Sequence, residues 1–216
     1  MTIRGTELLL RLSVEPDRGL VEAVGAELAE EIVAAQQEDL LDLVAAWRRV
    51  GWQRRVAVAL ESDSDAAARR VARRGLNVEP PPQSRGAVAS RLRLAAGRAQ
   101  TVALLDRPMA DFSMSALEGL IRRADEGLSI LPDLAGGWIG LAFDARNAGI
   151  LDHGLSLESV CCSAAADGVV CIPHQPCGRL DGSEELRALS LRLRAGGRHA
   201  ARTRRVLARS SLLAGL

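Results

Sequence analysis

An aspartate that could meet a ligand stands directly after an apolar run, at Asp106. The run, 101–105, is short and partly β-branched, and Arg107 and Pro108 follow the aspartate. Such a run, bounded by polar and turn residues, is typical of a strand buried on both faces of a parallel sheet. In open α/β sheets, ligands bind beyond the carboxyl ends of the strands. Asp106 is therefore placed to meet a metal or a polar ligand, or else to serve as a turn or N-cap aspartate before the next helix.

A second set of side chains with ligand chemistry occurs at Cys171, His174 and Cys177, at three-residue spacing. Structural zinc usually takes paired ligands from two such knuckles, whereas buried free cysteine is common in protein cores. The sequence therefore favours cysteines in the core and a loop over a zinc site. A fourth ligand for zinc would have to come from Cys161, Cys162 or His153.

Composition excludes several function classes. The net charge of +1 gives no electrostatic case for binding nucleic acid, and 2% aromatic residues are too few for base-stacking platforms. All 28 basic residues are arginine, which excludes lysine-based chemistry. No apolar run reaches the roughly 18 residues of a spanning helix, and the first residues do not form a signal peptide. We expect a cytoplasmic protein with no membrane span.

Hydrophobic periodicity predicts strands that alternate with helices. Strands are predicted at 8–14, 54–60, 76–79, 101–105, 128–131, 138–143 and 169–172. Helices are predicted at 26–50, 62–74, 86–96, 113–125, 157–166 and 183–194, with 15–19 as a loop. This alternation is typical of an α/β fold with a mainly parallel sheet, here a three-layer αβα sandwich over residues 1–196. A basic C-terminal tail, 197–216, is predicted to be helical and could bind a partner or pack on the domain with a solvated arginine face.

Short motifs also follow one another in a recognisable order. They are the Pro/Gly loop at 16–19, Gln83 with Gly86 and Arg91, Asp106 with Pro108, the Gly136-Gly137-Trp138 segment, and Asp181 before the 183–194 helix. In this order and spacing, over roughly residues 6–194, the chain resembles the GT-A-like nucleotidyl- and glycosyltransferase superfamily. The glycosyltransferase-A-like family associated with radical-SAM gene clusters is similar. So are the guanylyltransferases that activate 2-phospholactate or phosphoenolpyruvate.

The resemblance implies a nucleotide-diphospho-sugar transferase-like fold and a role for each motif. The implied nucleotide-binding residues are Arg18, Gln83, Gly86, Arg91 and Asp106. The implied acceptor side consists of Gly136, Gly137 and Trp138. Asp106 and Asp181 would hold Mg²⁺ or Mn²⁺, because magnesium is commonly bound by one or two carboxylates plus substrate phosphates. The implied ligand is a nucleotide or a nucleotide-sugar.

Several charged positions of the family pattern are replaced in this chain. Glu22 and Val24 stand where the pattern has a basic pair, and Ala87, Ala135 and Arg179 stand where it has acids. These departures leave two function classes open. One is a transferase that uses a nucleoside triphosphate or nucleotide-sugar with a divalent metal. The other is a catalytically inactive relative that binds a protein partner or forms a homodimer as a scaffold.

Two further expectations concern Arg179 and the cysteines. If Arg179 pairs with Asp181, its guanidinium closes the metal site. A redox or zinc-responsive module built on the cysteines is a third functional hypothesis.

Overall fold

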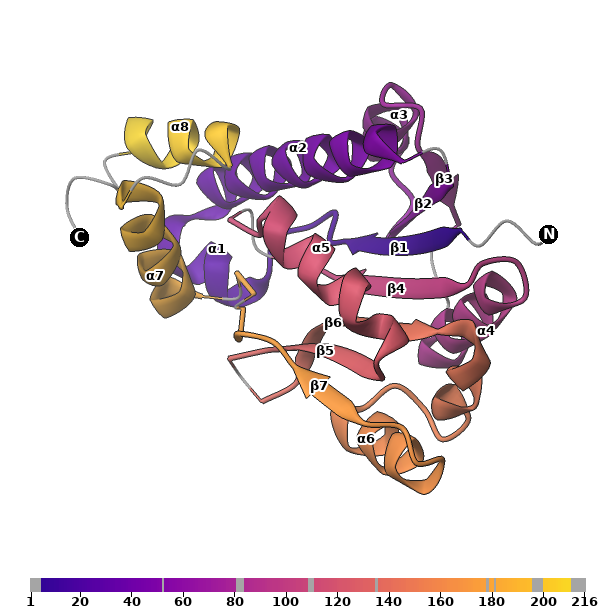
Figure 1. The fold of residues 1–216 in the computed structure, drawn as a ribbon. Coiled ribbons are helices and arrows are strands. Elements are labelled where there is room, and N and C mark those ends of the chain that lie inside the picture. The colour runs from indigo at the N-terminus through magenta and orange to yellow at the C-terminus, as the bar shows by residue number, and fades with distance from the viewer. Residues whose placement is uncertain are drawn as a thin grey trace.

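A seven-stranded sheet forms the middle of the molecule, within the part that the computed structural model describes (Figure 1). The described residues are 5–51, 53–80, 84–108, 111–134, 136–177, 179–180, 182–195 and 200–210. The strands in chain order are β1 (Thr6–Leu12), β2 (Arg54–Leu60), β3 (Asn77–Glu79), β4 (Thr101–Asp106), β5 (Leu128–Pro132), β6 (Trp138–Asp144) and β7 (Cys171–Pro173). Their order across the sheet is β3-β2-β1-β4-β6-β5-β7.

The sheet is mainly parallel. β6 runs antiparallel to both of its neighbours, β4 and β5, whereas β1, β2, β3 and β4 pair in parallel, as do β5 and β7. The carboxyl ends of β1, β2 and β4 therefore lie at one edge of the sheet.

Helices cover both faces of the sheet and one end. On one face lie α2 (Ala26–Val50), α3 (Asp65–Ala72) and α5 (Met114–Arg122), which is followed by the 3-10 turn η1 (Arg123–Asp125). On the other face lie α4 (Arg85–Ala96), the 3-10 segment η2 (Ala145–Leu151) and α6 (Leu157–Ala166). A third cluster joins α1 (Arg18–Val24), α7 (Ser183–Arg194) and α8 (Ala201–Arg209) to the first half of α2. The predicted three-layer α/β sandwich is confirmed.

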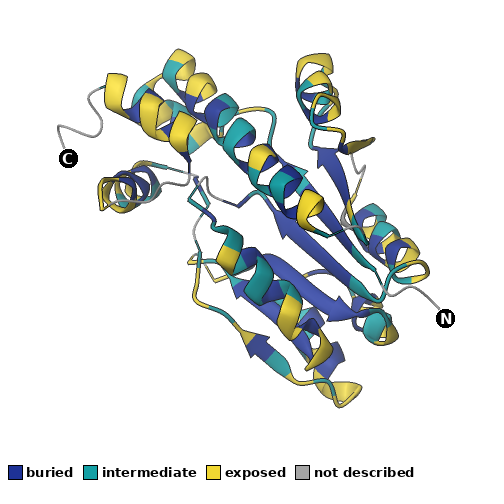
Figure 2. Ribbon diagram, turned by 45° about the horizontal axis from the view of Figure 1, so that its top comes forward, coloured by how far each residue is buried: buried dark blue, intermediate teal, exposed yellow. Residues whose placement is uncertain are grey.

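Alternation along β1 explains the two cores. Leu8, Leu10 and Leu12 pack against the α2 side, while Leu9 packs against the α4 side. Because successive side chains of a strand point to opposite faces, Arg11 lies on the α4 side as well. Burial follows from this arrangement: the central strands are buried almost throughout, whereas the edge strand β3, many loops and the outer faces of the helices are exposed (Figure 2).

Some predicted boundaries were wrong. The 15–19 segment is not a loop throughout, because α1 begins at Arg18, where the Asp17 carboxylate accepts from the Gly19 amide at 2.9 Å. η2 was not predicted at all. β1 runs over 6–12 instead of 8–14. Its bounds follow from its pairing with β2, which extends from Thr6 opposite Arg54 to Leu12 opposite Leu60.

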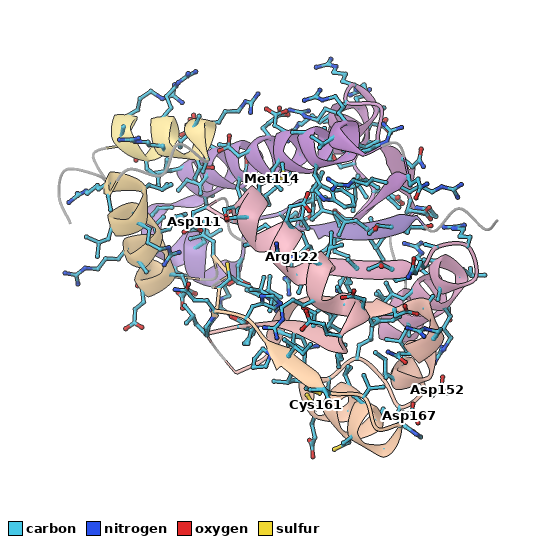
Figure 3. All side chains as sticks on the ribbon, viewed as in Figure 1. Asp111, Met114, Arg122, Asp152, Cys161 and Asp167 are labelled. Atoms are coloured by element: carbon cyan, nitrogen blue, oxygen red, sulfur yellow. The ribbon has the colours of Figure 1, made fainter. Side chains whose placement is uncertain are left out.

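α8, in the segment predicted as a basic tail, packs on α2. Asp39 of α2 accepts hydrogen bonds from the amides of Arg202 and Thr203 at 3.1 and 2.9 Å. Asp39 therefore caps a helix that has no capping side chain of its own. In the same cluster of helices, Arg192 of α7 pairs with Asp111. Asp111, which is labelled in Figure 3, lies just before α5.

Candidate functional site

Two opposite charges meet where β1 and β4 end. Arg11 is the register partner of Asp106 on the neighbouring strand. Its Nη1 lies 3.0 Å from Oδ1 of Asp106, and the two side chains are only 21% and 10% exposed. Both lie on the α4 side of the sheet, because each alternates with core residues of the opposite face.

A second arginine reaches Asp106 from a distant part of the chain. After β7, Cys177 forms a parallel bridge with Asp133, and its amide donates to the Pro132 carbonyl at 3.0 Å. This bridge holds the following segment against the end of β5 and places Arg179. Nη2 of Arg179 donates to Oδ2 of Asp106 at 3.2 Å and to the Trp138 carbonyl at 2.9 Å.

A third arginine, Arg107, follows Asp106 with a left-handed backbone, φ +51°. Its amide donates to the Arg11 carbonyl at 3.0 Å, so the ladder between the strands continues one residue past β4. Gln36 of α2 donates to the Pro108 carbonyl at 2.9 Å and fixes the next residue. The Nε of Arg107 lies 3.3 Å from Glu61, which follows β2, and 3.9 Å from Asp106.

These arginines line one wall of a cleft with a volume of about 500 Å³. We call it the arginine cleft. It is lined by Arg11, Val88, Asp106, Arg107, Gly136, Gly137, Trp138, Leu155, Ser156, Leu157, Glu158 and Arg179. Elsewhere in the lining, the indole Nε1 of Trp138 donates to the Leu155 carbonyl at 2.7 Å, and Ser156 caps α6. A volume of this size is typical of small-ligand sites.

The structure brings only part of the predicted site together. Asp106 and the predicted acceptor side, Gly136, Gly137 and Trp138, line the arginine cleft. Gly86 lies in the first turn of α4, the helix that contributes Val88 to the cleft wall.

Other predicted residues lie elsewhere. Arg18 is exposed and pairs with Glu22 at 2.8 Å. Arg91 donates to the Pro80 carbonyl and lines a separate hollow with Glu7 and Arg98. Gln83 and Asp181 lie outside the described residues, so their predicted roles stay predictions.

Sequence reasoning missed Arg11 and Arg107. The signal was present, because Arg11 interrupts the apolar run of β1 near its carboxyl end, and Arg107 directly follows the apolar run of β4. Once the strands are taken as parallel, these two arginines and Glu61 after β2 all fall at the same sheet edge.

The residues described at this edge do not fit Mg²⁺ or Mn²⁺. Each oxygen of Asp106 already faces a guanidinium, Oδ1 that of Arg11 and Oδ2 that of Arg179. A metal ion bound at Asp106 would displace an arginine or lie beside one; two unit charges 4 Å apart repel by about 4 kcal/mol at an effective dielectric constant of 20. Within the described ranges, no group of three His, Cys, Asp or Glu side chains is placed to hold a metal ion.

The cysteines of this set are divided between the two faces of the sheet, because Cys161 and Cys171 pack on the α4 side and Cys177 packs on the α2 side. The Nε2 of His174 is 2.6 Å from the Oγ of Ser129, which is fully buried in β5. Cys161 lies on α6, where Figure 3 labels it. Burial, and then the neighbouring Cys171, raises the pKa of Cys161 to about 11, so this thiol is protonated at neutral pH. The contacts of His174 and Cys161 are those of packed side chains.

Comparisons with known proteins identify the fold. No model of a known protein family matches the chain, and no curated protein matches it by sequence. A protein from Desulfovibrio desulfuricans G20, provisionally assigned as a nucleotide-diphospho-sugar transferase, superimposes with a TM-score of 0.78 at 13% identity, over 98% of this chain and 97% of that one. This chain has the fold of a nucleotide-diphospho-sugar transferase. The GT-A-like fold expected from the motifs is confirmed.

Two further solved structures are similar. Glucosyl-3-phosphoglycerate synthase from Mycobacterium tuberculosis, solved with Mn²⁺, UDP and glucosyl-3-phosphoglycerate, has a TM-score of 0.52 at 13% identity, over 99% of this chain and 81% of that one. A 4-diphosphocytidyl-2C-methyl-D-erythritol synthase has a TM-score of 0.48 at 17% identity, over 89% of this chain and 99% of that one. None of the helices in the described part of the chain has the length and apolar character needed to cross a membrane.

Proposed function

We propose that this chain is a transferase that binds a nucleoside triphosphate or a nucleotide-sugar in the arginine cleft. The observation that carries the proposal is the pairing of Arg11 with Asp106 at the carboxyl ends of β1 and β4. In open α/β sheets this edge is where ligands bind. The solved complex of glucosyl-3-phosphoglycerate synthase with UDP, a neighbour in fold, supports a nucleotide-sugar as the class of ligand.

The cleft supplies the parts that a transfer from a nucleotide needs. Guanidinium groups bind phosphate oxygens through charge-assisted hydrogen bonds, and arginines aimed at a departing diphosphate stabilise the charge that develops on it. The wall of Gly136, Gly137 and Trp138 would face the acceptor. Gly136 has a backbone φ of +90° and is exposed, so this wall leaves room for an incoming group.

Finer assignments from the motifs belong to this proposal. The base would lie toward α4, near Gly86 and Gln83. The relation to the radical-SAM-associated family and to the guanylyltransferases, and a cytoplasmic location, stay predictions from the sequence. The metal role predicted for Asp106 and Asp181 enters no step here, because a guanidinium group faces each oxygen of Asp106.

Calorimetric titration with GTP, CTP, UTP and UDP-sugars tests the proposal. We expect micromolar binding of one nucleotide class, weakened at least tenfold in Arg11→Gln and unchanged in Arg98→Gln. Arg98 is a matched control, because it pairs with Glu7 at the amino end of β1, on the same face of the sheet as Arg11. Absence of binding to every nucleotide, by a protein that melts cooperatively, would overturn the proposal.

A further inference from the structure

The three guanidinium groups of the arginine cleft hold hydrogen-bond donors that lack acceptors. The Nε atoms of Arg11, Arg107 and Arg179 are all buried without a hydrogen-bond partner among the described residues. The ion pairs that the Nε atoms of Arg107 and Arg179 make, at 3.3–3.9 Å, do not have hydrogen-bond geometry. Buried donors are nearly always satisfied in native proteins, and each exception calls for an explanation such as an absent ion or ligand.

The described side chains that line the cleft carry three positive and two negative charges. Three arginines line it against two acids, Asp106 and Glu158. Glu61 and Asp133 also contact these arginines, but neither lines the cleft. An anion that entered would meet the unused donors of these arginines, whereas a divalent cation at Asp106 would lie beside two guanidinium groups.

Asp106 holds the arginines in place. Its two oxygens contact Arg11 and Arg179 from opposite sides, at 3.0 and 3.2 Å. The carboxylate thus gathers guanidinium groups from β1 and from the segment after β7 at one point. It acts as a positioning residue, because Oδ2 accepts a hydrogen bond from Arg179 and Oδ1 faces the Arg11 guanidinium, although Oδ1 has no hydrogen-bond partner among the described residues.

The backbone of Arg107 is held in a costly conformation at this same point. A left-handed φ is unfavourable for residues other than glycine, asparagine and aspartate. Here the φ of +51° is fixed on both sides, by the bond to the Arg11 carbonyl and by the bond from Gln36 to Pro108. Backbone strain of this kind concentrates at ligand-binding sites.

We propose that Arg11, Arg107 and Arg179 form a diphosphate-binding site that works without a divalent metal ion. The ligand class is the diphosphate group of a nucleotide, so the inference rests on the proposed function and adds how the phosphates are held. Arg179, which stands where the family pattern has an acid, supplies by its guanidinium the positive charge that a metal would otherwise supply.

Calorimetric titration with inorganic pyrophosphate in excess EDTA tests this site. We expect binding in EDTA, weakened about 10- to 100-fold in Arg179→Gln, because each lost charge-assisted contact is worth that factor. Arg98→Gln should bind like the wild type. If Arg179→Gln fails to fold because Asp106 is left without its partner, Arg107→Gln and the double variant Asp106→Asn/Arg179→Gln carry the test, and both should also bind more weakly.

The outcomes separate this inference from the proposed function. Nucleotide binding that needs Mg²⁺ or Mn²⁺, without pyrophosphate binding in EDTA, overturns the metal-free site and keeps the transferase. Pyrophosphate binding that is unchanged in all of these arginine variants overturns the site as assigned. Pyrophosphate binding in EDTA without binding of any nucleotide supports the arginine site and overturns the proposed function.

Discussion

The guanidinium of Arg179 donates to the carboxylate of Asp106 at 3.2 Å, across 73 residues of sequence. The sequence raised the question of whether Arg179 would pair with Asp181 and close a metal site. The contact that the structure describes is with the aspartate that ends β4; Asp181 lies outside the described residues, so its pairing with Arg179 stays a prediction. Arg179 stands where the family pattern has an acid. This replacement therefore places a guanidinium group against the Asp106 carboxylate in the cleft.

Asp106→Asn should destabilise the fold. The change removes the charge that compensates Arg11 and Arg179, both about four-fifths buried. Breaking one partner of such a set costs about 1–3 kcal/mol, to be measured as the free energy of unfolding in urea. The double variant Asp106→Asn/Arg179→Gln should lose less than the sum of the two single variants. Strict additivity would contradict direct coupling between the two side chains.

Arg107→Gly should separate stability from binding. Glycine adopts a left-handed backbone without strain, so relief of strain offsets the entropy that glycine costs in the unfolded chain. We expect a midpoint of thermal unfolding equal to or above that of the wild type, together with nucleotide affinity reduced at least tenfold. A large loss of stability would show that the Arg107 side chain is needed for the fold itself.

Asp39→Ala should release α8. Asp39 is the cap of that helix, and its side chain is only 5% exposed. Loss of an N-cap carboxylate costs about 1–2 kcal/mol, and amide hydrogen exchange in 201–209 should accelerate. The control is Glu31→Ala, because Glu31 makes an exposed pair with Arg209 in the same helix and such pairs contribute little. Equal effects of the two substitutions would contradict the capping role.

Stability should fall below pH 6.5 through His174. Burial, and then the charge of Arg123, lowers the pKa of His174 in the folded chain below its ordinary value of 6.5. The unfolded chain therefore binds a proton first, so the stabilisation is complete above pH 6.5 and is lost as the pH falls toward the folded-state pKa. His174→Gln should flatten the dependence of unfolding free energy between pH 8 and pH 5.5. An unchanged slope would contradict this assignment.

The first and last residues of the long periodic elements could be predicted from the sequence. The helix at 26–50 repeats apolar residues at three- and four-residue steps up to Gly51, and α2 has those bounds. β2, α6 and α7 likewise match their predicted ranges. α1 was missed in part because a seven-residue helix gives almost no periodic signal, and its start depends on the local cap at Asp17.

Of the residues that line the arginine cleft, the sequence predicted only Asp106 and the segment 136–138 as site residues. Arg11 is visible as a charge near the end of an apolar strand, but its importance depends on which strand lies beside it. Arg179 depends on the isolated bridge between Asp133 and Cys177, a tertiary contact that no local pattern encodes.

The structure of the chain bound to the nucleotide that calorimetry selects tests the central claim most directly. The account predicts that the phosphates lie in the arginine cleft, within hydrogen-bond distance of Arg11 and Arg179, with the base toward α4. A nucleotide bound elsewhere, such as the hollow lined by Arg91 and Arg98, would contradict it.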